Sequence, residues 1–380
     1  MKIQILFILL MNVSNIISQE IEIIKTEKKD VSFRGIYAVD DSIVWISGNK
    51  GTVGKSRDGG KTFKWLNPAK YETRDFRDIE VFNDSTAIIM AIESPGIILK
   101  TINSGKSWKE VYKDETEGVF FDAIYFSNEK NGILLGDPLS KFPYFLVSDD
   151  AGSSWKSLSE EQELKLLPIL NEGESFFASS GTNALISKDY IFMVTGGTES
   201  NLYYIGKNKI VRKQIPILQG KISQGANSID FKVFPDKNNL GVIVGGDFNE
   251  PKKSKGNCML FSFTEKGFDF FEAQKPPRGY KSCVEILSEN MVIACGTSGV
   301  DASFDKGMNW EYISKESFHT LQKSKTGNTV FFAGANGNFG KINFEETKVE
   351  EPILENPDET SEAGTPENSE KKEEKNILNK

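Results

Sequence analysis

A short turn phrase recurs four times in this chain of 380 residues. Its pattern is Ser/Thr-x-Asp/Asn-x-Gly-x-x-Trp/Phe, and the copies occupy residues 56–63, 101–108, 148–155 and 303–310. The Asp or Asn side chain can accept backbone N–H bonds, Gly can adopt a positive φ, and the aromatic residue suits the start of a strand. Each copy therefore predicts a tight β-turn that leads into a new strand.

The spacing of the turn phrase indicates a repeat. The first three copies start at residues 56, 101 and 148, which are 45 and 47 residues apart, and the fourth starts 155 residues further on, about three steps of 52. Two repeats between the third and fourth copies have therefore lost the phrase but kept the length. A period of about 40 to 50 residues with several short strands is typical of a β-propeller, whose blades bury their faces against one another.

The strand pattern indicates seven units rather than four. β-Branched and aromatic residues interrupted by Gly, Asn and Asp favour strands over helices. The last unit, residues 318–344, has room for only three strands, and residues 21–25 alternate like an edge strand that completes it. We therefore predict an all-β, seven-bladed propeller closed by its N-terminal strand, with units opening near Phe33, Phe76, Phe120, Phe176, Asn227, Lys281 and Phe318.

Both ends of the chain differ from the repeats. Residues 1–18 carry Lys2 and then an apolar run too short to span a bilayer, which predicts a cleavable signal peptide and a secreted or periplasmic protein. No Cys follows that run, so lipid attachment is not expected. Residues 348–380 are predicted to be a disordered acidic tail, because nine acidic residues and no aromatic residue lie within 351–380. The propeller itself is assigned to residues 19–347.

Composition limits the possible partners. The formal net charge of −8 argues against nucleic-acid binding, which needs a basic stripe. The mature chain contains no segment long and apolar enough for a transmembrane helix. His319 is the only histidine and no cysteine cluster accompanies it, so no metal site is predicted, and no cofactor is expected. We expect the propeller to be a monomer.

Two of the three cysteines flank a turn. If Leu287 pairs with Met291 across residues 288–290, Cys283 falls opposite Cys295, since 287 + 291 equals 283 + 295. Facing Cβ atoms in a non-hydrogen-bonded antiparallel pair come close enough for a disulfide. The two alternatives are a disulfide and a pair of buried small hydrophobic residues, and Cys258 is free in both.

Residues 32–39 and 44–54, the turn phrase, and residues 76–79 and 131–138 together resemble the BNR/Asp-box propellers related to the photosystem II stability and assembly factor. The resemblance covers roughly residues 32–345 and is weakest in the fourth and fifth units. It implies an exported, non-catalytic scaffold that binds another protein. The chain departs from the family pattern at Asn103, which replaces Asp, and at Phe63, which replaces Trp. Some relatives are labelled oxidoreductases, yet no glycine-rich dinucleotide-binding phrase opens a helix here.

The residues of the turn phrase, which is the Asp-box of that family, are expected to be structural. They should lie between the third and fourth strands of a blade, on the face opposite most propeller binding sites. Their hydrogen bonds and aromatic packing leave little for a ligand. These structural residues are Asp58, Asn103, Asp150, Asp305, Trp108, Trp155 and Trp310.

The predicted binding site is the mouth of the central channel, where the first strands of the blades begin. When the units are aligned on Ile36, Ile79 and Ile124, polar residues occupy the same position in several first strands. Two aspartates that follow strand-ending glycines should lie at the same mouth. Arginines there suit bidentate contact with a carboxylate. In the alternative, they merely pair with Asp78, Asp122 or Asp137. The mouth residues are Arg34, Arg77, Asp122, Asn227, Lys281 and His319, with Asp137 and Asp247.

Three functions compete at this stage. A protein-binding scaffold or assembly factor is the first. The second is a sialidase-like or other glycoside hydrolase, because Asp-boxes also occur in such propellers, but a carboxylate pair such as Asp137 and Asp247 would belong to blades on opposite sides of a wide channel. The third is a carbohydrate-binding or small-ligand-binding propeller. A Ser or Cys triad is not predicted, because the chain has one histidine and no Gly-x-Ser-x-Gly phrase.

Overall fold

The computed structural model describes residues 20–344 except 159–164, 188, 208, 237 and 265. The predicted signal peptide (1–18) and acidic tail (348–380) lie outside the described residues. The described part forms seven antiparallel sheets and no helix, which confirms the predicted all-β, seven-bladed propeller. Within this range, no helix has the length and apolar character needed to cross a bilayer.

The first three sheets each contain four consecutive strands. Blade 1 contains β2 (Phe33–Ala38), β3 (Val44–Gly48), β4 (Thr52–Ser56) and β5 (Lys64–Trp65). Blade 2 contains β6 (Phe76–Val81), β7 (Ala87–Ala91), β8 (Gly96–Thr101) and β9 (Lys109–Asp114). Blade 3 contains β10 (Phe121–Phe126), β11 (Gly132–Gly136), β12 (Tyr144–Ser148) and β13 (Lys156–Ser157).

The remaining sheets are less uniform. Blade 4 contains β15 (Ala184–Ile186), β16 (Tyr190–Val194), β18 (Asn201–Gly206) and β19 (Lys209–Gln214). Blade 5 contains β20 (Gln224–Val233), β21 (Asn239–Asp247), β22 (Cys258–Thr264) and β23 (Gly267–Phe271), extended by β17 (Gly196–Gly197) and β14 (Glu174–Ser175). Blade 6 contains β24 (Cys283–Ile286), β25 (Val292–Gly296), β26 (Gly299–Ser303) and β27 (Trp310–Ser314). Blade 7 contains β28 (Thr320–Lys323), β29 (Thr329–Ala333), β30 (Asn338–Asn343) and β1 (Glu22–Lys25).

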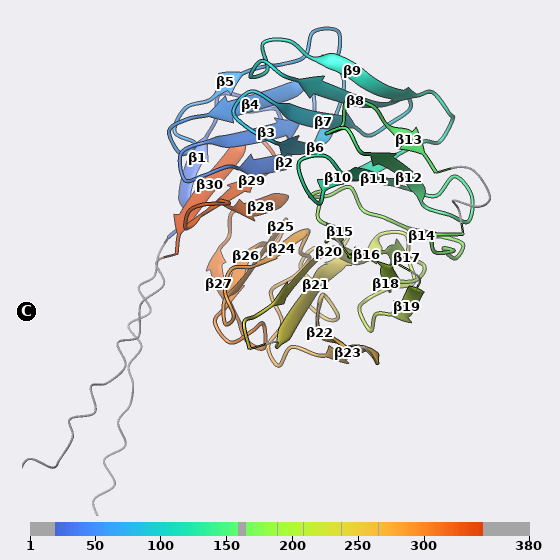
Figure 1. Ribbon diagram of the computed structural model, residues 1–380. Helices are drawn as coiled ribbons and strands as arrows, with labels where there is room; N and C mark the ends of the chain where they lie inside the picture. The colour runs from blue at the N-terminus through green and yellow to red at the C-terminus, as the bar shows by residue number, and fades with distance from the viewer. Residues whose placement is uncertain are drawn as a thin grey trace, which may run out of the picture. The chain divides into compact units, whose positions relative to one another are not determined.

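The blades form a closed ring. The innermost strand of each blade contacts that of the next, from β2 through β6, β10, β15, β20, β24 and β28 back to β2. Figure 1 shows these strands around the centre and the fourth strands at the periphery. The N-terminal β1 pairs with β30, so Ile23 lies opposite Gly340, as predicted. This pairing covers the edge that a three-stranded last blade would expose.

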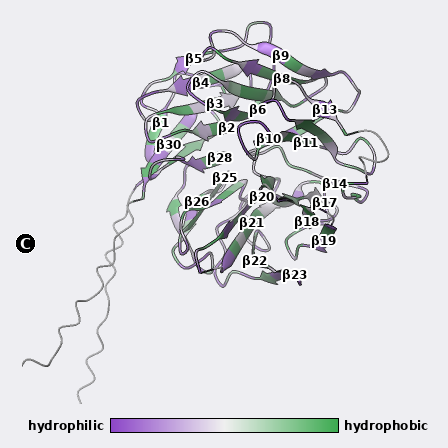
Figure 2. Ribbon diagram, viewed as in Figure 1, coloured by the Kyte–Doolittle hydropathy of each residue, from purple (hydrophilic) through white to green (hydrophobic). Residues whose placement is uncertain are grey.

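The hydrophobic core is divided among the interfaces between blades. Each of seven clusters of buried residues joins two neighbouring blades, for example Trp45 and Val53 of blade 1 with Phe76 and Ile89 of blade 2. Figure 2 shows hydrophobic residues concentrated in the strands. Because both faces of a blade are covered, strands such as β7 are buried at every position rather than at alternate ones.

All four turn phrases lie between the third and fourth strands of a blade. In the first copy, the Gly60 N–H donates to Ser56 Oγ at 2.8 Å, and the Thr62 N–H donates to Asp58 Oδ1 at 2.9 Å. The same two bonds recur in the other three copies. Gly60 has φ 82°, in the region that favours glycine.

The glycine of each turn phrase also contacts the preceding blade. A Cβ added at Gly60 would lie 2.1 Å from the Phe339 ring of blade 7, and one at Gly152 would lie 2.2 Å from Ile88 of blade 2. The corresponding neighbours of Gly105 and Gly307 are Leu66 of blade 1 and Leu260 of blade 5. The phrase therefore packs neighbouring blades together in addition to closing a turn.

Blade 4 corrects one prediction. Phe176 does not open a channel-lining strand, because the innermost strand of that blade, β15, begins only at Ala184. The chain before β15 first pairs through β14 with β17 and then enters the channel. Glu174 anchors this departure: its buried carboxylate accepts hydrogen bonds from Thr195, Asn201, Tyr203 and the Asn171 N–H.

The predicted register of the two cysteines is confirmed, and Cys283 faces Cys295. Both are buried free thiols, as is Cys258. The Leu287 N–H donates to the Met291 carbonyl at 2.8 Å, so pairs at every second position, including the cysteines, are hydrogen-bonded pairs. The disulfide prediction assumed the closer, non-hydrogen-bonded kind, whose Cα atoms lie about 1 Å nearer to each other.

Candidate functional site

The predicted mouth residues lie at β-bulges. The strand register shifts at Arg34 in blade 1, at Arg77 in blade 2, at Asp122 in blade 3 and at Asn227 in blade 5. At His319 in blade 7, two successive residues face Ala333, the arrangement of a bulge. A bulge re-aims a side chain and interrupts the alternation of faces, so the same residue of several blades can point toward the channel.

A segment of the chain crosses the channel next to these bulges. Residues 176–183 run between the end of β14 and the start of β15 and form hydrogen bonds with all six other blades. The Ser180 hydroxyl donates to the Ser282 carbonyl at 2.7 Å, and the Ile229 N–H donates to the Thr182 carbonyl at 2.9 Å. Gly181 has φ 67°, and a Cβ there would lie 2.6 Å from the Asp78 carboxyl group. The segment separates the channel into two cavities, which it lines from both sides.

The two arginines face this segment at the predicted mouth. Arg34 Nη1 donates to the Ser179 carbonyl and Arg77 Nη1 to the Ala178 carbonyl, both at 3.4 Å, the weak end of the hydrogen-bond range. Arg77 Nε also pairs with Asp75 at 2.9 Å. Neither guanidinium forms an ion pair with Asp78, Asp122 or Asp137 among the described residues, so the predicted internal pairing is not observed. Both guanidinium groups retain donors for a ligand.

The electrostatics of the mouth favour an anion. Burial and the adjacent Arg77 lower the pKa of Arg34, which still leaves it charged at neutral pH. Burial and both arginines lower the pKa of His319 to about 3, so the imidazole is neutral. Burial raises the pKa of Asp137 to about 6, and it raises that of Asp122 well above its usual value, with the neighbouring Asp137 adding to the shift. The positive charges at the mouth are therefore only partly balanced.

Four of the predicted residues line the mouth cavity, and the other four lie outside its lining. Arg34, Arg77, Asp137 and His319 line a cavity of about 420 Å³. Asp122 is buried behind it, and neither of its carboxyl oxygens has a hydrogen-bond partner in the described part of the chain. Asn227 is buried as well, where it accepts hydrogen bonds from Ser179 and Tyr280.

Lys281 and Asp247 have structural contacts instead. Lys281 is fully buried in an ion pair with Asp301 at 2.7 Å, so its placement at the mouth was wrong. Ser282 and Cys283 both face Cys295, so Ser282 occupies the bulge position in blade 6. The prediction had assigned that position to Lys281, one residue earlier. Asp247 accepts hydrogen bonds from Gln224 at 3.0 Å and from the Asn249 N–H at 2.9 Å. It fixes a loop outside the lining of the cavity.

Sequence reasoning missed the aromatic wall of the mouth. Phe177 packs edge-to-face on Phe248 with centroids 5.9 Å apart, and Phe248 packs on Tyr280 at 6.4 Å. Phe120 lies 5.9 Å from the Arg77 guanidinium. Phe248 is 44% exposed, so the wall presents apolar surface beside the arginines. The run of small residues at 178–182 was the available signal for the crossing segment, because only a segment with small side chains fits inside the channel.

The arrangement can bind an anionic group beside an apolar one. Two arginines with free donors can hold a carboxylate or a row of backbone carbonyls, and the aromatic wall can receive an apolar side chain next to them. Among the described residues, no group of three or more His, Cys, Asp or Glu side chains is placed to hold a metal ion.

Comparisons with known proteins show that the fold is similar to that of solved propellers. No protein-family model matches the chain, and no curated protein sequence matches it. The structure titled "YCF48 bound to D1 peptide" is similar with a TM-score of 0.58 and 14% identity, covering 86% of this chain and 97% of that one. YCF48 from Cyanidioschyzon merolae gives a TM-score of 0.58 and 16% identity over 85% and 99% of the two chains. The WD40 propeller domain of Doa1 gives 0.55 and 11% over 86% and 97%. At these identities the likeness shows the fold.

Proposed function

We propose that this protein is a non-catalytic scaffold of the cell envelope that binds another protein through the arginine-lined mouth of its channel. The partner presents a peptide with a carboxylate, or with backbone carbonyls, to Arg34 and Arg77. An apolar side chain of the same peptide packs against Phe248. The protein is exported through its N-terminal segment and acts as a monomer.

The unsatisfied state of the two arginines carries this proposal. A buried or half-buried guanidinium normally has a strong acceptor, since an unmet charged donor loses hydration without compensation. Here the acceptors are two backbone carbonyls at 3.4 Å and, for Arg77 alone, Asp75. A ligand carboxylate at this position would make shorter, charge-assisted bonds than the crossing segment does.

The solved relatives support a peptide ligand. One of the two YCF48 structures holds a D1 peptide, and the Doa1 neighbour is a WD40 propeller. The turn phrase supports placing the chain among the BNR/Asp-box propellers related to the photosystem II assembly factor. A photosynthetic partner does not follow, because the identity to these structures is low and the residues of the mouth carry the proposal.

Capture from native cell-envelope extracts with mass spectrometry tests the proposal. The wild type is compared with an Arg34→Met/Arg77→Met variant of matched thermal stability. A control, Lys61→Met/Lys106→Met, removes two exposed charges from the turn phrases at the opposite end of the blades. We expect a protein captured by the wild type and the control and lost from the arginine variant. Equal capture by all three would reject the mouth as the site, and no specific protein in any sample would reject the scaffold.

A further inference from the structure

The opposite end of the channel holds a second, larger cavity. Its volume is about 550 Å³, within the range of small-molecule sites, and segment 176–183 separates it from the arginine mouth. The innermost strands of all seven blades contribute to its lining. Six of its polar side chains come from one rank of the blades, namely Tyr37, Glu80, Tyr125, Asp230, Glu285 and Gln322.

Four of these six side chains have a structural role. Each of the four accepts a hydrogen bond from a backbone N–H of the next blade and so joins two blades. Asp230 accepts from Ile286 at 2.6 Å, Glu285 from Lys323 at 2.7 Å and Gln322 from Ala38 at 2.7 Å. Tyr125 joins blades 3 and 4 in the same way, through the Ala184 N–H. In blade 2 this role belongs to Asp78, which accepts from the Ile124 N–H at 2.9 Å.

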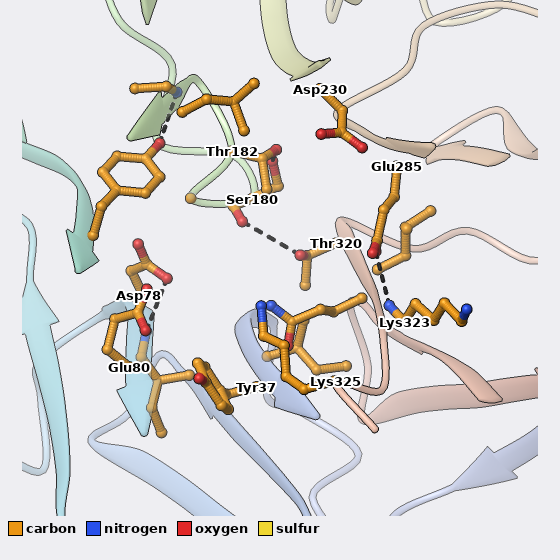
Figure 3. A pocket seen from close by; sticks show the side chains of 18 of the residues that line it. Tyr37, Asp78, Glu80, Ser180, Thr182, Asp230, Glu285, Thr320, Lys323 and Lys325 are labelled. Carbon is orange, nitrogen blue, oxygen red and sulfur yellow. Dashed lines mark hydrogen bonds between the residues drawn. The ribbon is translucent and has the colours of Figure 1, made fainter. Parts of the chain in front are cut away.

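Three side chains are not explained by this role. Since Asp78 already joins blade 2 to blade 3, Glu80 has no N–H to accept. Neither the Glu80 carboxylate nor the Tyr37 hydroxyl has a hydrogen bond or ion pair within the described residues. The Lys325 ammonium lies 5.3 Å from the centroid of the Tyr37 ring and likewise lacks an ion pair there. Figure 3 shows Tyr37, Glu80 and Lys325 on one side of the cavity and Asp230 and Glu285 across it.

The charges of the cavity are of both signs and poorly compensated. Burial raises the pKa of Glu80 to about 7 although Lys325 opposes the shift, and burial together with Asp230 raises that of Glu285 to about 7. A ligand cation next to Glu80 would favour its ionised form, and a ligand anion would complement Lys325. The titratable groups that face Glu80 from all sides are Tyr37, Asp78, Tyr125, Asp230, Lys232, Glu285, Lys323 and Lys325.

Glu80, Tyr37 and Lys325 lie in one cavity, and their side chains have no hydrogen bond or ion pair within the described residues. From this we infer a second binding site for a small zwitterion, an α-amino acid or a short peptide. Its ammonium pairs with Glu80 and donates a second hydrogen bond to the Tyr37 hydroxyl oxygen. Its carboxylate pairs with Lys325, with Lys323 nearby. A ligand with only one of the two charges leaves the other protein group without a partner, so the site discriminates against it. This site is independent of the arginine mouth.

Calorimetric titration with a matched set of alanine peptides tests the inference on the full chain. The zwitterions are alanine, dialanine and trialanine, which separate amino acids from peptides. N-acetyl-trialanine retains only the carboxylate, and trialanine amide retains only the ammonium. We expect at least one zwitterion to bind and both blocked forms to bind about tenfold more weakly or worse, as expected for loss of a charged pair. Failure of all three zwitterions to bind at millimolar concentration would overturn the site.

Two near-isosteric variants and one control assign the charges. Glu80→Gln and Lys325→Met should each weaken zwitterion binding about tenfold. Lys61→Met/Lys106→Met should leave it unchanged. Binding to the wild type near neutral pH should release protons, because Glu80 ionises, and this release should disappear in Glu80→Gln. It is measured by repeating the titration in buffers of different ionisation enthalpy. Unchanged affinity in both variants, or equal binding of the blocked peptides, would contradict the inference.

Discussion

Blades 2 and 4 have the same four-stranded plan and are stabilised in different ways. Blade 2 has a full-length innermost strand, β6, that begins with the buried Phe76, and its turn phrase packs Gly105 against blade 1. Blade 4 has no turn phrase, and its innermost strand, β15, has three residues. The chain that would have formed the start of that strand crosses the channel instead.

The difference shows where a repeat protein can build something new. A regular blade commits its backbone groups to the sheet and its side chains to two neighbouring blades. The shortened strand of blade 4 releases residues 176–183 to line both channel cavities. The polar cluster around Glu174 stabilises the departure point with four hydrogen bonds to one buried carboxylate. Function is expected where local regularity is lost and compensated elsewhere.

The largest expected effect is therefore in blade 4. Glu174→Ala should lower the free energy of unfolding by about 3 kcal/mol, because it leaves several buried donors without an acceptor. The matched control is Glu289→Ala in blade 6, where a half-exposed ion pair with Lys306 is lost at a cost of about 0.5 kcal/mol. Urea unfolding measures both. Equal effects would mean that the polar cluster does not replace the turn phrase.

The regular blades are tested at the glycine of a turn phrase. Gly60→Ala should cost about 2 to 3 kcal/mol, since the new methyl group would overlap the Phe339 ring at a residue with φ 82°. Gly220→Ala is the control, because φ there is also positive, 111°, but no atom lies within 4 Å of the added Cβ. It should cost about 1 kcal/mol, for backbone strain alone. If the two variants melt alike, the contact between blades contributes nothing beyond the turn.

The same contrast decides what the sequence could predict. A phrase such as residues 56–63 contains its own turn chemistry, so its recurrence predicts blades. The strand pattern predicts their number, and the short last unit predicts the need for a closing strand. The alternation in residues 21–25 was sufficient to identify β1. In blade 4 the period gives only the length of the repeat. Whether residues 176–183 enter the sheet or the channel depends on contacts with all six other blades, most of which are distant in the sequence.

The site was predictable to the same extent. Arg34 and Arg77 follow a phenylalanine that opens a strand, and this local pattern placed them at the mouth. Lys281 was misplaced by one residue, because a bulge adds a residue to one strand and the sequence does not say which residue is extra. The aromatic wall depends on Tyr280 and Phe248, which precede and follow strands of different blades, so no local pattern joins them.

A smaller effect distinguishes two copies of the turn phrase. Asp58→Ala in blade 1 and Asn103→Ala in blade 2 should each cost about 1 kcal/mol near pH 7, through loss of the bond to the Thr62 or Ser107 N–H. Hydrogen bonds from Thr62 lower the pKa of Asp58 from 3.8 to about 2. Because the folded pKa is lower, the carboxylate's contribution is full above about pH 4 and is lost as the pH falls toward 2.

Thermal melting across that range should therefore show the Asp58→Ala deficit shrinking in acid while the Asn103→Ala deficit stays constant. Asn103 accepts the same N–H bond but does not titrate. An equal response of the two deficits to pH would show that ionisation of Asp58 does not contribute to the turn.

The smallest effect concerns the arginine mouth, and it rests on the proposed function. Asp137 lines that cavity with a pKa of about 6, so it becomes negative as the pH rises through 6 and then repels a ligand carboxylate. N-acetylphenylalanine, which combines a carboxylate with an aromatic ring, serves as the probe. Its affinity for the wild type should fall about threefold between about pH 5 and about pH 8, a modest change because Arg34 and Arg77 remain charged throughout. The pKa of His319, about 3, lies below this range, and burial raises the pKa of Asp122 well above its usual value.

The Asp137→Asn variant tests the contribution of the Asp137 charge to probe binding. The amide oxygen can still accept the Phe176 N–H, which Asp137 Oδ1 now accepts at 2.9 Å, so the crossing segment stays anchored at its start. The variant should bind the probe about threefold more tightly than the wild type near pH 8 and show a flat pH profile, as measured by nuclear magnetic resonance titration. A wild-type affinity that rises with pH would mean that the probe does not lie beside Asp137. A pH dependence that persists in Asp137→Asn would transfer the titration to Asp122, whose buried carboxyl group also lies near Arg77.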